Sequence, residues 1–124
     1  MEDKFKYVYD PSTRILYKYY YGAITLKDIC SSWDYAISNK IIPEGTRSFI
    51  LDYRDAYFDM KLKGHRGIAD YYKKHLDVFG NCKIAIITQT PEDVVIPTLV
   101  ELIDDGYYSQ PFYTLEAAVN WVLS

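Results

Sequence analysis

Charged side chains that could bind an anion or a polar partner gather in one short segment, residues 52–63. Arg54 precedes Asp55, and a guanidinium group can hold a carboxylate or a phosphate through two parallel hydrogen bonds. The structural alternative is an Arg–Asp pair that only fixes the backbone of the segment. The candidate binding residues are Asp52, Arg54, Asp55, Asp59, Lys61 and Lys63.

The sequence carries no pattern that assigns a catalytic or metal-binding role. His65 and His75 are ten residues apart, whereas two ligands on one helical face need a spacing of about three or four residues. Cys30 and Cys82 form neither a CxxC pair nor a metal-ligand spacing. We therefore predict a protein that is not an enzyme, with no catalytic residue, no metal site and no cofactor.

One partial pattern resembles the phosphoacceptor site of response-regulator receivers, in which an Asp ends the third strand and a Thr or Ser ends the next. Asp52 or Asp55 could form such a pair with Thr88. However, the first expected strand is followed by the single acid Asp10, without the acidic pair that would hold Mg²⁺. A receiver-like phosphoacceptor is therefore the last of the alternatives for function.

Composition restricts the partners further. A net charge of −3 lacks the basic field that sequence-independent nucleic-acid binding requires. The longest apolar runs, near residues 84–87 and 94–96, are too short to cross a bilayer. Residues 1–4 show no apolar segment of a secretory signal. We therefore expect a cytoplasmic protein that binds no nucleic acid and has no integral membrane segment.

Two aromatic-rich strands are expected at the start of the chain, over residues 4–9 and 14–21. The sequence DPST between them is typical of a type I turn, which predicts an antiparallel hairpin. Gly22 is expected to end the second strand. One face of that strand carries Ile15, Tyr17, Tyr19 and Tyr21, and the other face carries Leu16, Lys18 and Tyr20.

The tyrosines of this hairpin suggest an interface. If the helices crowd on one side of the sheet, one face of the hairpin lacks cover, and an uncovered aromatic edge favours association with a symmetric partner. We predict a homodimer, and the alternative is a monomer whose tyrosine hydroxyls contact water. The candidate interface residues are Tyr17, Tyr19, Tyr20 and Tyr21.

After the hairpin, helices and strands alternate. Thr25, Thr90 and Thr114 suit N-cap positions of helices, and Pro97 is expected to kink or restart the third helix. Strands are expected at residues 48–53, 82–88 and 111–113, with four helices between and after them. The order β-β-α-β-α-β-α-β-α indicates one α/β domain, residues 1–124, with a mainly parallel sheet. The charged segment would then be a loop beyond the carboxyl ends of the strands, where ligands gather in such sheets.

Several phrases of the sequence point to one family. The hairpin is followed by YGAITLKDI, FILDYRDA, CKIAIITQTP and PFYTLEAAVNWV, an arrangement that resembles the STAS-like, SpoIIAA-like domains and, among them, an uncharacterised bacterial branch. The resemblance covers nearly the whole chain. It implies a right-handed βα superhelix with a mixed, mainly parallel five-stranded sheet, an N-terminal antiparallel hairpin and four helices.

The best-known members of that family are anti-sigma-factor antagonists, which are switched by phosphorylation of a Ser or Thr after the third strand. The matching stretch, residues 52–64, contains neither Ser nor Thr, so the resemblance does not extend to this switch. It implies a non-catalytic protein-interaction or regulatory module with a protein partner. The alternative is a small-ligand or lipid-binding module, if the helices stand off the sheet and leave an apolar cavity.

Overall fold

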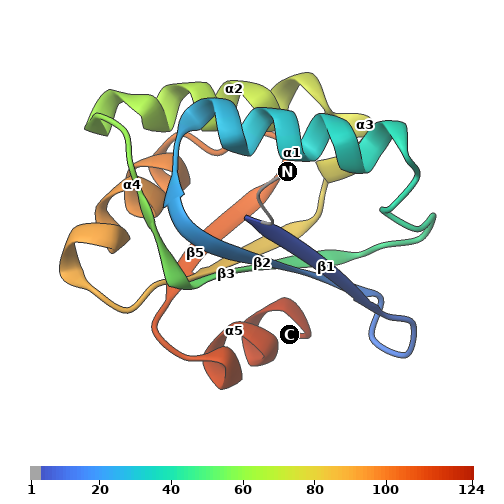
Figure 1. The fold of residues 1–124 in the computed structure, drawn as a ribbon. Helices are drawn as coiled ribbons and strands as arrows, with labels where there is room; N and C mark the ends of the chain where they lie inside the picture. The colour runs from blue at the N-terminus through green and yellow to red at the C-terminus, as the bar shows by residue number, and fades with distance from the viewer. Residues whose placement is uncertain (1–3) are drawn as a thin grey trace.

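The computed structural model describes residues 4–124 and shows one five-stranded sheet in the order β1-β2-β3-β4-β5 (Figure 1). β1 and β2 are antiparallel, and every other neighbouring pair is parallel. The mixed, mainly parallel sheet with an opening hairpin is therefore confirmed. Residues 1–3, which enter the expectation about a secretory signal, lie outside the described part. The strands are β1 (Phe5–Asp10), β2 (Ile15–Ile24), β3 (Ser48–Phe58), β4 (Lys83–Ile87) and β5 (Tyr108–Phe112).

Helices follow β2, β3, β4 and β5, in the predicted order. The side chains of Thr25, Thr90 and Thr114 accept hydrogen bonds from the first turns of three helices, which confirms these N-caps. The second expected helix is divided, because the chain leaves helical geometry at His75, with φ −124° and ψ 43°. The helices are α1 (Leu26–Ser38), α2 (His65–Lys74), the short α3 (Leu76–Phe79), α4 (Pro91–Leu102) and α5 (Leu115–Val122), with a 3₁₀ turn η1 (Leu62–Gly64) before α2.

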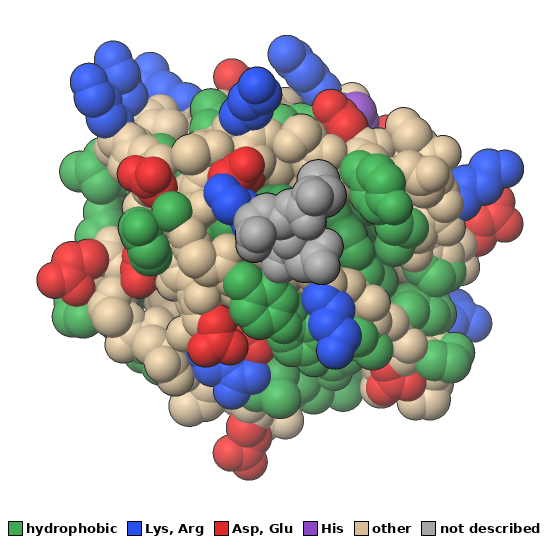
Figure 2. Space-filling model, in the orientation of Figure 1, with side chains coloured by type: hydrophobic (Ala, Val, Ile, Leu, Met, Phe, Trp, Pro, Cys, Tyr) green, Lys and Arg blue, Asp and Glu red, His purple; other side chains and the backbone are tan. Residues whose placement is uncertain are grey.

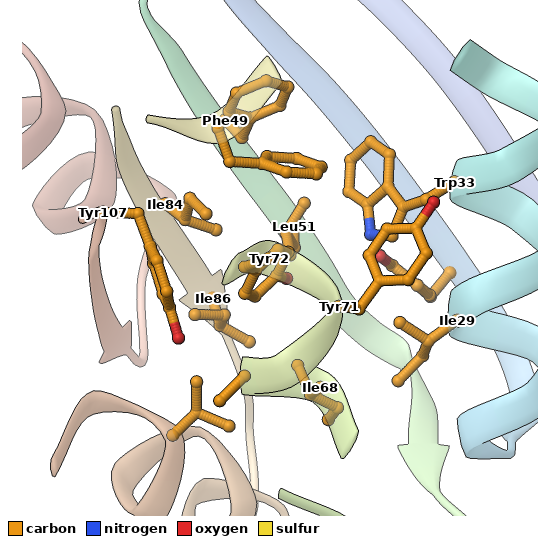
Figure 3. Packing of buried hydrophobic residues seen from close by; sticks show 14 of the residues in the cluster. Ile29, Trp33, Phe49, Leu51, Ile68, Tyr71, Tyr72, Ile84, Ile86 and Tyr107 are labelled. Atoms are coloured by element: carbon orange, nitrogen blue, oxygen red, sulfur yellow. The ribbon is translucent and has the colours of Figure 1, made fainter. Parts of the chain in front are cut away.

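The helices cover the two faces of the sheet unequally. α1, α2 and α4 bury one face, where aromatic rings surround the indole of Trp33. Figure 3 shows side chains of α1 and α2 meeting those of β3 and β4 in this large core. α5 packs on the opposite face through Ala118 and Val122, whereas Leu115 at the start of the same helix is 37% exposed.

The cover on the α5 side extends over only part of the sheet. α5 contacts β3, β4 and β5, and in Figure 1 it lies beneath this part of the sheet. α5 has at most marginal contact with β1 and β2, although Ile15 of β2 is fully buried in the cluster that contains Ala118 and Val122, and Tyr17 packs against this cluster. The part of the outer face that lies beyond Tyr17 is therefore the uncovered face that the sequence left conditional.

Two strands are longer than predicted. β2 continues through Gly22 to Ile24, and β3 continues past residue 53 to Phe58, because the two extensions pair with each other in parallel. Gly22 adopts φ +78°, a backbone conformation open to glycine, and so it turns the strand without ending it. The predicted loop over residues 54–58 is therefore wrong, and this segment is part of the sheet.

Two further boundaries differ from expectation. α4 continues through Pro97 without a restart. β5 begins at Tyr108 rather than at residue 111, since its first residues pair with the start of β4.

Candidate functional site

The structure divides the predicted binding residues into two groups. Asp52 and Arg54 lie together on the sheet face that also carries α5, and they form an ion pair. Asp59 follows the end of β3, where its backbone N–H donates to the carbonyl of Ile24 at 2.8 Å. Lys61 and Lys63 are exposed at η1, and among residues 4–124 neither takes part in an ion pair. Asp55 is exposed within β3.

Arg54 holds the carboxylate of Asp52 through several hydrogen bonds. Its Nη2 donates to Oδ2 at 2.6 Å, and its Nε donates to Oδ1 at 3.0 Å. The backbone N–H of Arg54 also donates to Oδ1, at 3.0 Å. Asp52 is only 5% exposed. The sequence left open whether Arg54 binds a ligand or a neighbouring carboxylate, and in the structure it binds Asp52 rather than the adjacent Asp55.

The pair sits at a β-bulge. Tyr19 is opposite Asp52 and Tyr21 is opposite Asp55, so β3 has one residue more than β2 over this interval. The extra residue reverses the alternation of β3. Tyr53 and Phe58 are five positions apart, an odd interval that would place them on opposite faces of a regular strand, yet both face the large core. Bulges turn side chains toward new directions and are frequent at functional sites. Here the bulge places the successive charged side chains of Arg54 and Asp55 on the outer side of the sheet.

Aromatic side chains lie next to this ion pair. Tyr17 and Tyr19 stack with their ring centroids 6.4 Å apart, and burial together with the nearby Asp52 carboxylate raises the pKa of the Tyr19 hydroxyl. Two residues of the charged segment, Asp52 and Arg54, and three of the predicted tyrosines therefore share one surface. We call this surface the tyrosine face and define it as Val8, Tyr17, Tyr19, Tyr21, Asp52 and Arg54.

Tyr20 does not belong to the tyrosine face. It is 1% exposed, and its ring stacks on that of Tyr53 at 4.0 Å inside the large core. Its inclusion among the interface residues is therefore corrected: the alternation of β2 directs it inward, together with Leu16 and Lys18.

Among the comparisons with known proteins, only the comparison with solved structures gives matches. No protein-family model matches the sequence, and no curated protein matches it. An uncharacterized protein of the DUF3478 family from Shewanella loihica PV-4, described as having a SpoIIAA-like fold, superposes with a TM-score of 0.62 at 15% identity. The alignment covers 95% of this chain and 91% of that one. This chain has a SpoIIAA-like fold. SpoIIAA itself, an anti-sigma factor antagonist in its unphosphorylated form, superposes with a TM-score of 0.51 at 14% identity, over 95% of this chain and 96% of its own.

Within this SpoIIAA-like fold, the stretch over residues 52–64 is divided between a strand and a 3₁₀ turn. Residues 52–58 continue β3, and residues 62–64 form η1. Neither Ser nor Thr occurs in residues 52–64. Of the residues in the receiver-like alternative, Thr88 is fully buried and Asp52 is bound by Arg54, whereas Asp55 is exposed.

A second feature of the SpoIIAA-like fold is a small cavity on the helix-covered side. Its volume is about 20 Å³, room for about one water molecule. The walls come from the sheet and from three helices, and all of them are aliphatic or aromatic. The lining residues are Ile29, Leu51, Tyr53, Phe58, Ile68, Tyr72, Ile86, Ile96, Pro97 and Val100.

Sequence reasoning placed Lys18 on the inner face of β2 but did not single it out. Its side chain is fully buried, and its Nζ donates to the hydroxyl of Ser32. The sequence indicates this burial only through the alternation of β2, which places Lys18 on the same face as Leu16 and Tyr20, both core residues.

Two further kinds of feature, a metal site and a membrane-spanning helix, were sought among the described residues. Residues 4–124 contain no group of three or more His, Cys, Asp or Glu side chains placed to hold a metal ion. None of the helices in this range combines the length and apolar character needed to cross a membrane.

Proposed function

We propose that this chain is a non-catalytic interaction module that binds a protein partner through the tyrosine face. One observation carries the proposal: Tyr19 and Tyr21 lie on the part of the sheet that α5 leaves uncovered, with Tyr17 at its margin, beside the bulge at which Arg54 binds Asp52. SpoIIAA, whose fold is similar, is an anti-sigma factor antagonist, which supports a regulatory interaction as the kind of role.

The physical properties of the surface suit this role. Tyrosine supplies a large contact area with few rotatable bonds and keeps a hydroxyl for hydrogen bonds, and it is enriched in the centres of protein interfaces. Val8 and Tyr21 are 43% and 37% exposed, so a partner would bury apolar surface that now contacts water. Four hydrogen bonds from Arg54 hold the Asp52 carboxylate in place beside the tyrosines.

The test replaces the central tyrosine. In tagged protein recovered from its native host, Tyr19→Lys is expected to reduce the amount of the specific partner at least tenfold, since central aromatic contacts dominate interface energies. Tyr113→Lys is the matched control, because Tyr113 is an exposed tyrosine that follows β5, at the opposite edge of the sheet. Quantitative mass spectrometry measures the partner, and thermal unfolding shows that both variants fold.

The outcome that contradicts the proposal is equally definite. If Tyr19→Lys and Tyr113→Lys retain the partner as the unchanged protein does, the tyrosine face is not the binding surface. We also propose that the protein is cytoplasmic. Cys30 and Cys82 are both free, and free thiols persist in reducing compartments such as the cytoplasm.

A second candidate function rests on the cavity. A ligand-binding module of the same fold would take an apolar molecule, such as a lipid chain, between the sheet and the helices. The cavity has apolar walls on every side but is far smaller than an ordinary ligand site, which measures about 300–1,000 Å³. Binding would therefore require α2 and α4 to separate, and this candidate is argued at the scale of the whole molecule below.

A further inference from the structure

The two edges of the sheet differ in their capacity to add a strand. β1 and β5 are the outer strands. β5 carries Pro111 opposite Ile86, and proline offers no N–H to a further strand. β1 has six residues without a proline. Within residues 4–124 no strand lies beyond β1, and an open edge of this length is a template for strand pairing.

The hydrogen bonds of the hairpin show which groups of β1 face the open edge. The carbonyl of Lys4 accepts from the N–H of Tyr21 at 2.9 Å, and the carbonyl of Asp10 accepts from the N–H of Arg14 at 2.8 Å. Backbone groups alternate in direction along an antiparallel strand. Even-numbered residues of β1 therefore bond to β2, and Tyr7 and Tyr9 direct their N–H and C=O groups to the open edge.

The side chains of β1 are self-complementary. Lys6 and Val8 are exposed, and Asp10 follows them on the same face of the strand. When a second copy is laid antiparallel along this edge with Val8 at the centre, Lys6 of each copy faces Asp10 of the other. In this register Tyr7 and Tyr9 form the hydrogen-bonded pairs, which agrees with the direction of their backbone groups. The lysine–aspartate and valine–valine positions are then non-hydrogen-bonded pairs, where facing side chains lie closest.

We propose that two copies of this chain pair antiparallel along β1 about a two-fold axis at Val8, with ion pairs between Lys6 of each copy and Asp10 of the other. The occupant of the edge is a second copy rather than an unrelated peptide, because the strand complements its own reversed sequence in both charge and hydrogen bonding. Pairing would join two five-stranded sheets and place both tyrosine faces on one side. The inference goes beyond the proposed function and does not depend on it.

The surroundings of β1 favour the same arrangement. Figure 2 shows hydrophobic side chains with a cationic one among them along the line of β1. The hydroxyl of Tyr7 donates to the carbonyl of Ser32 on α1, and Tyr35, one turn further along the same helix, is 59% exposed. Hydrogen bonds from Ser12 and Thr13 hold the pKa of Asp10 below its usual range, so its carboxylate stays charged. A short interface of this kind predicts a dissociation constant on the order of micromolar to tens of micromolar.

A charge exchange tests the pairing. Sedimentation equilibrium at about 50 µM is expected to show a dimer. Lys6→Glu places an acid opposite Asp10 of the second copy, and Asp10→Lys places a base opposite Lys6, so each variant alone should dimerise at least tenfold more weakly. An equimolar mixture of the two variants should recover the dimer, because every facing pair is then complementary. Lys63→Glu is the control, since Lys63 is an exposed lysine on η1.

A second measurement covers the case in which Asp10→Lys disturbs the turn that Asp10 stabilises. In a Cys30→Ser background, Val8→Cys should form a disulfide-linked dimer on mild oxidation, whereas Lys6→Cys should not. The proposal is overturned by a monomer at about 100 µM, by a mixture that fails to restore the dimer although both variants fold, or by equal cross-linking at positions 6 and 8. Tyr19 lies opposite Lys6 in the hairpin, so the neutral variant Tyr19→Ala is used to separate the two proposals: it should lose the partner of the tyrosine face and retain the dimer.

Discussion

Lys18 enters the core from β2 and ends among aromatic rings. Its Nζ lies 3.8 Å from the ring centroid of Trp33, and the rings of Phe5, Tyr7 and Tyr20 lie within 4.7–5.5 Å. Among the described residues it forms no ion pair. Burial away from water lowers the pKa of Lys18 well below its ordinary value. The aromatic faces attract the ammonium group, but they replace only part of its lost hydration.

We predict that Lys18→Met increases stability at pH 7 by about 1–4 kcal/mol, the range found when apolar residues replace buried charges. Lys18 has a lowered pKa in the folded state and its ordinary pKa in the unfolded state. Between these two values the folded state binds fewer protons than the unfolded state, so the stability of the natural protein rises with pH. The destabilisation caused by burying Lys18 is greatest below its pKa in the folded state, and it disappears above about pH 10.4, the ordinary pKa of lysine. The advantage of the variant should therefore shrink as pH rises toward that value. Urea unfolding at several pH values measures both effects.

A suitable control for this comparison is Lys63→Met, which changes an exposed lysine and should leave stability nearly unchanged. A variant at position 18 that is less stable than the natural protein would show that the aromatic cage and the hydroxyl of Ser32 stabilise the ammonium group by more than burial costs.

At the scale of single elements, β3 shows where sequence reasoning succeeded and where it failed. The apolar run up to Tyr53 predicted a strand covered on both faces, and the structure agrees. Arg54 and Asp55 interrupt that run with charges, so the pattern favoured a loop. In the structure they are a bulge whose backbone pairs with the extension of β2. Polarity reports burial of side chains, whereas strand pairing depends on the backbone, and a bulge also removes the alternation that would reveal it.

The bulge yields a prediction about Arg54. Arg54→Ala removes the guanidinium that holds Asp52, whose carboxylate then stays buried with the backbone N–H of residue 54 as its remaining donor. We expect a loss of about 1–3 kcal/mol in unfolding free energy, the cost of leaving a buried polar group poorly satisfied. Chemical denaturation measures it, with Arg66→Ala as the control at an exposed arginine. An unchanged stability would mean that Asp52 finds water or another donor, and that Arg54 is free to bind a partner.

For the molecule as a whole, the two candidate functions lie on opposite faces of the sheet. The tyrosine face is on the side of α5, and the apolar cavity is on the side that α1, α2 and α4 cover. The alternation of helices and strands in the sequence predicted a mainly parallel sheet, and the alternation along β2 divided its side chains between two faces without deciding which face would lie outward. The cavity was only a condition in that reasoning, because its size depends on how closely Ile68 and Ile96 approach the sheet. Sub-ångström packing of this kind is not encoded in any periodic pattern.

The separation of faces leads to a prediction that tests the ligand-binding candidate. If α2 and α4 part to admit an apolar chain, a dansyl-labelled fatty acid should bind with an increase in fluorescence, at a rate limited by opening. Ile68→Trp fills the cavity and should weaken this binding at least tenfold, whereas Leu62→Trp, at a residue that is 58% exposed, should not change it. Overpacking costs about 1–3 kcal/mol, so thermal unfolding must show that the first variant folds. Tyr19→Lys should leave probe binding unchanged, because Tyr19 lies on the opposite face of the sheet. Absence of probe binding by the natural protein, or equal binding by both tryptophan variants, would reject the ligand-binding function and leave the tyrosine face as the site to pursue.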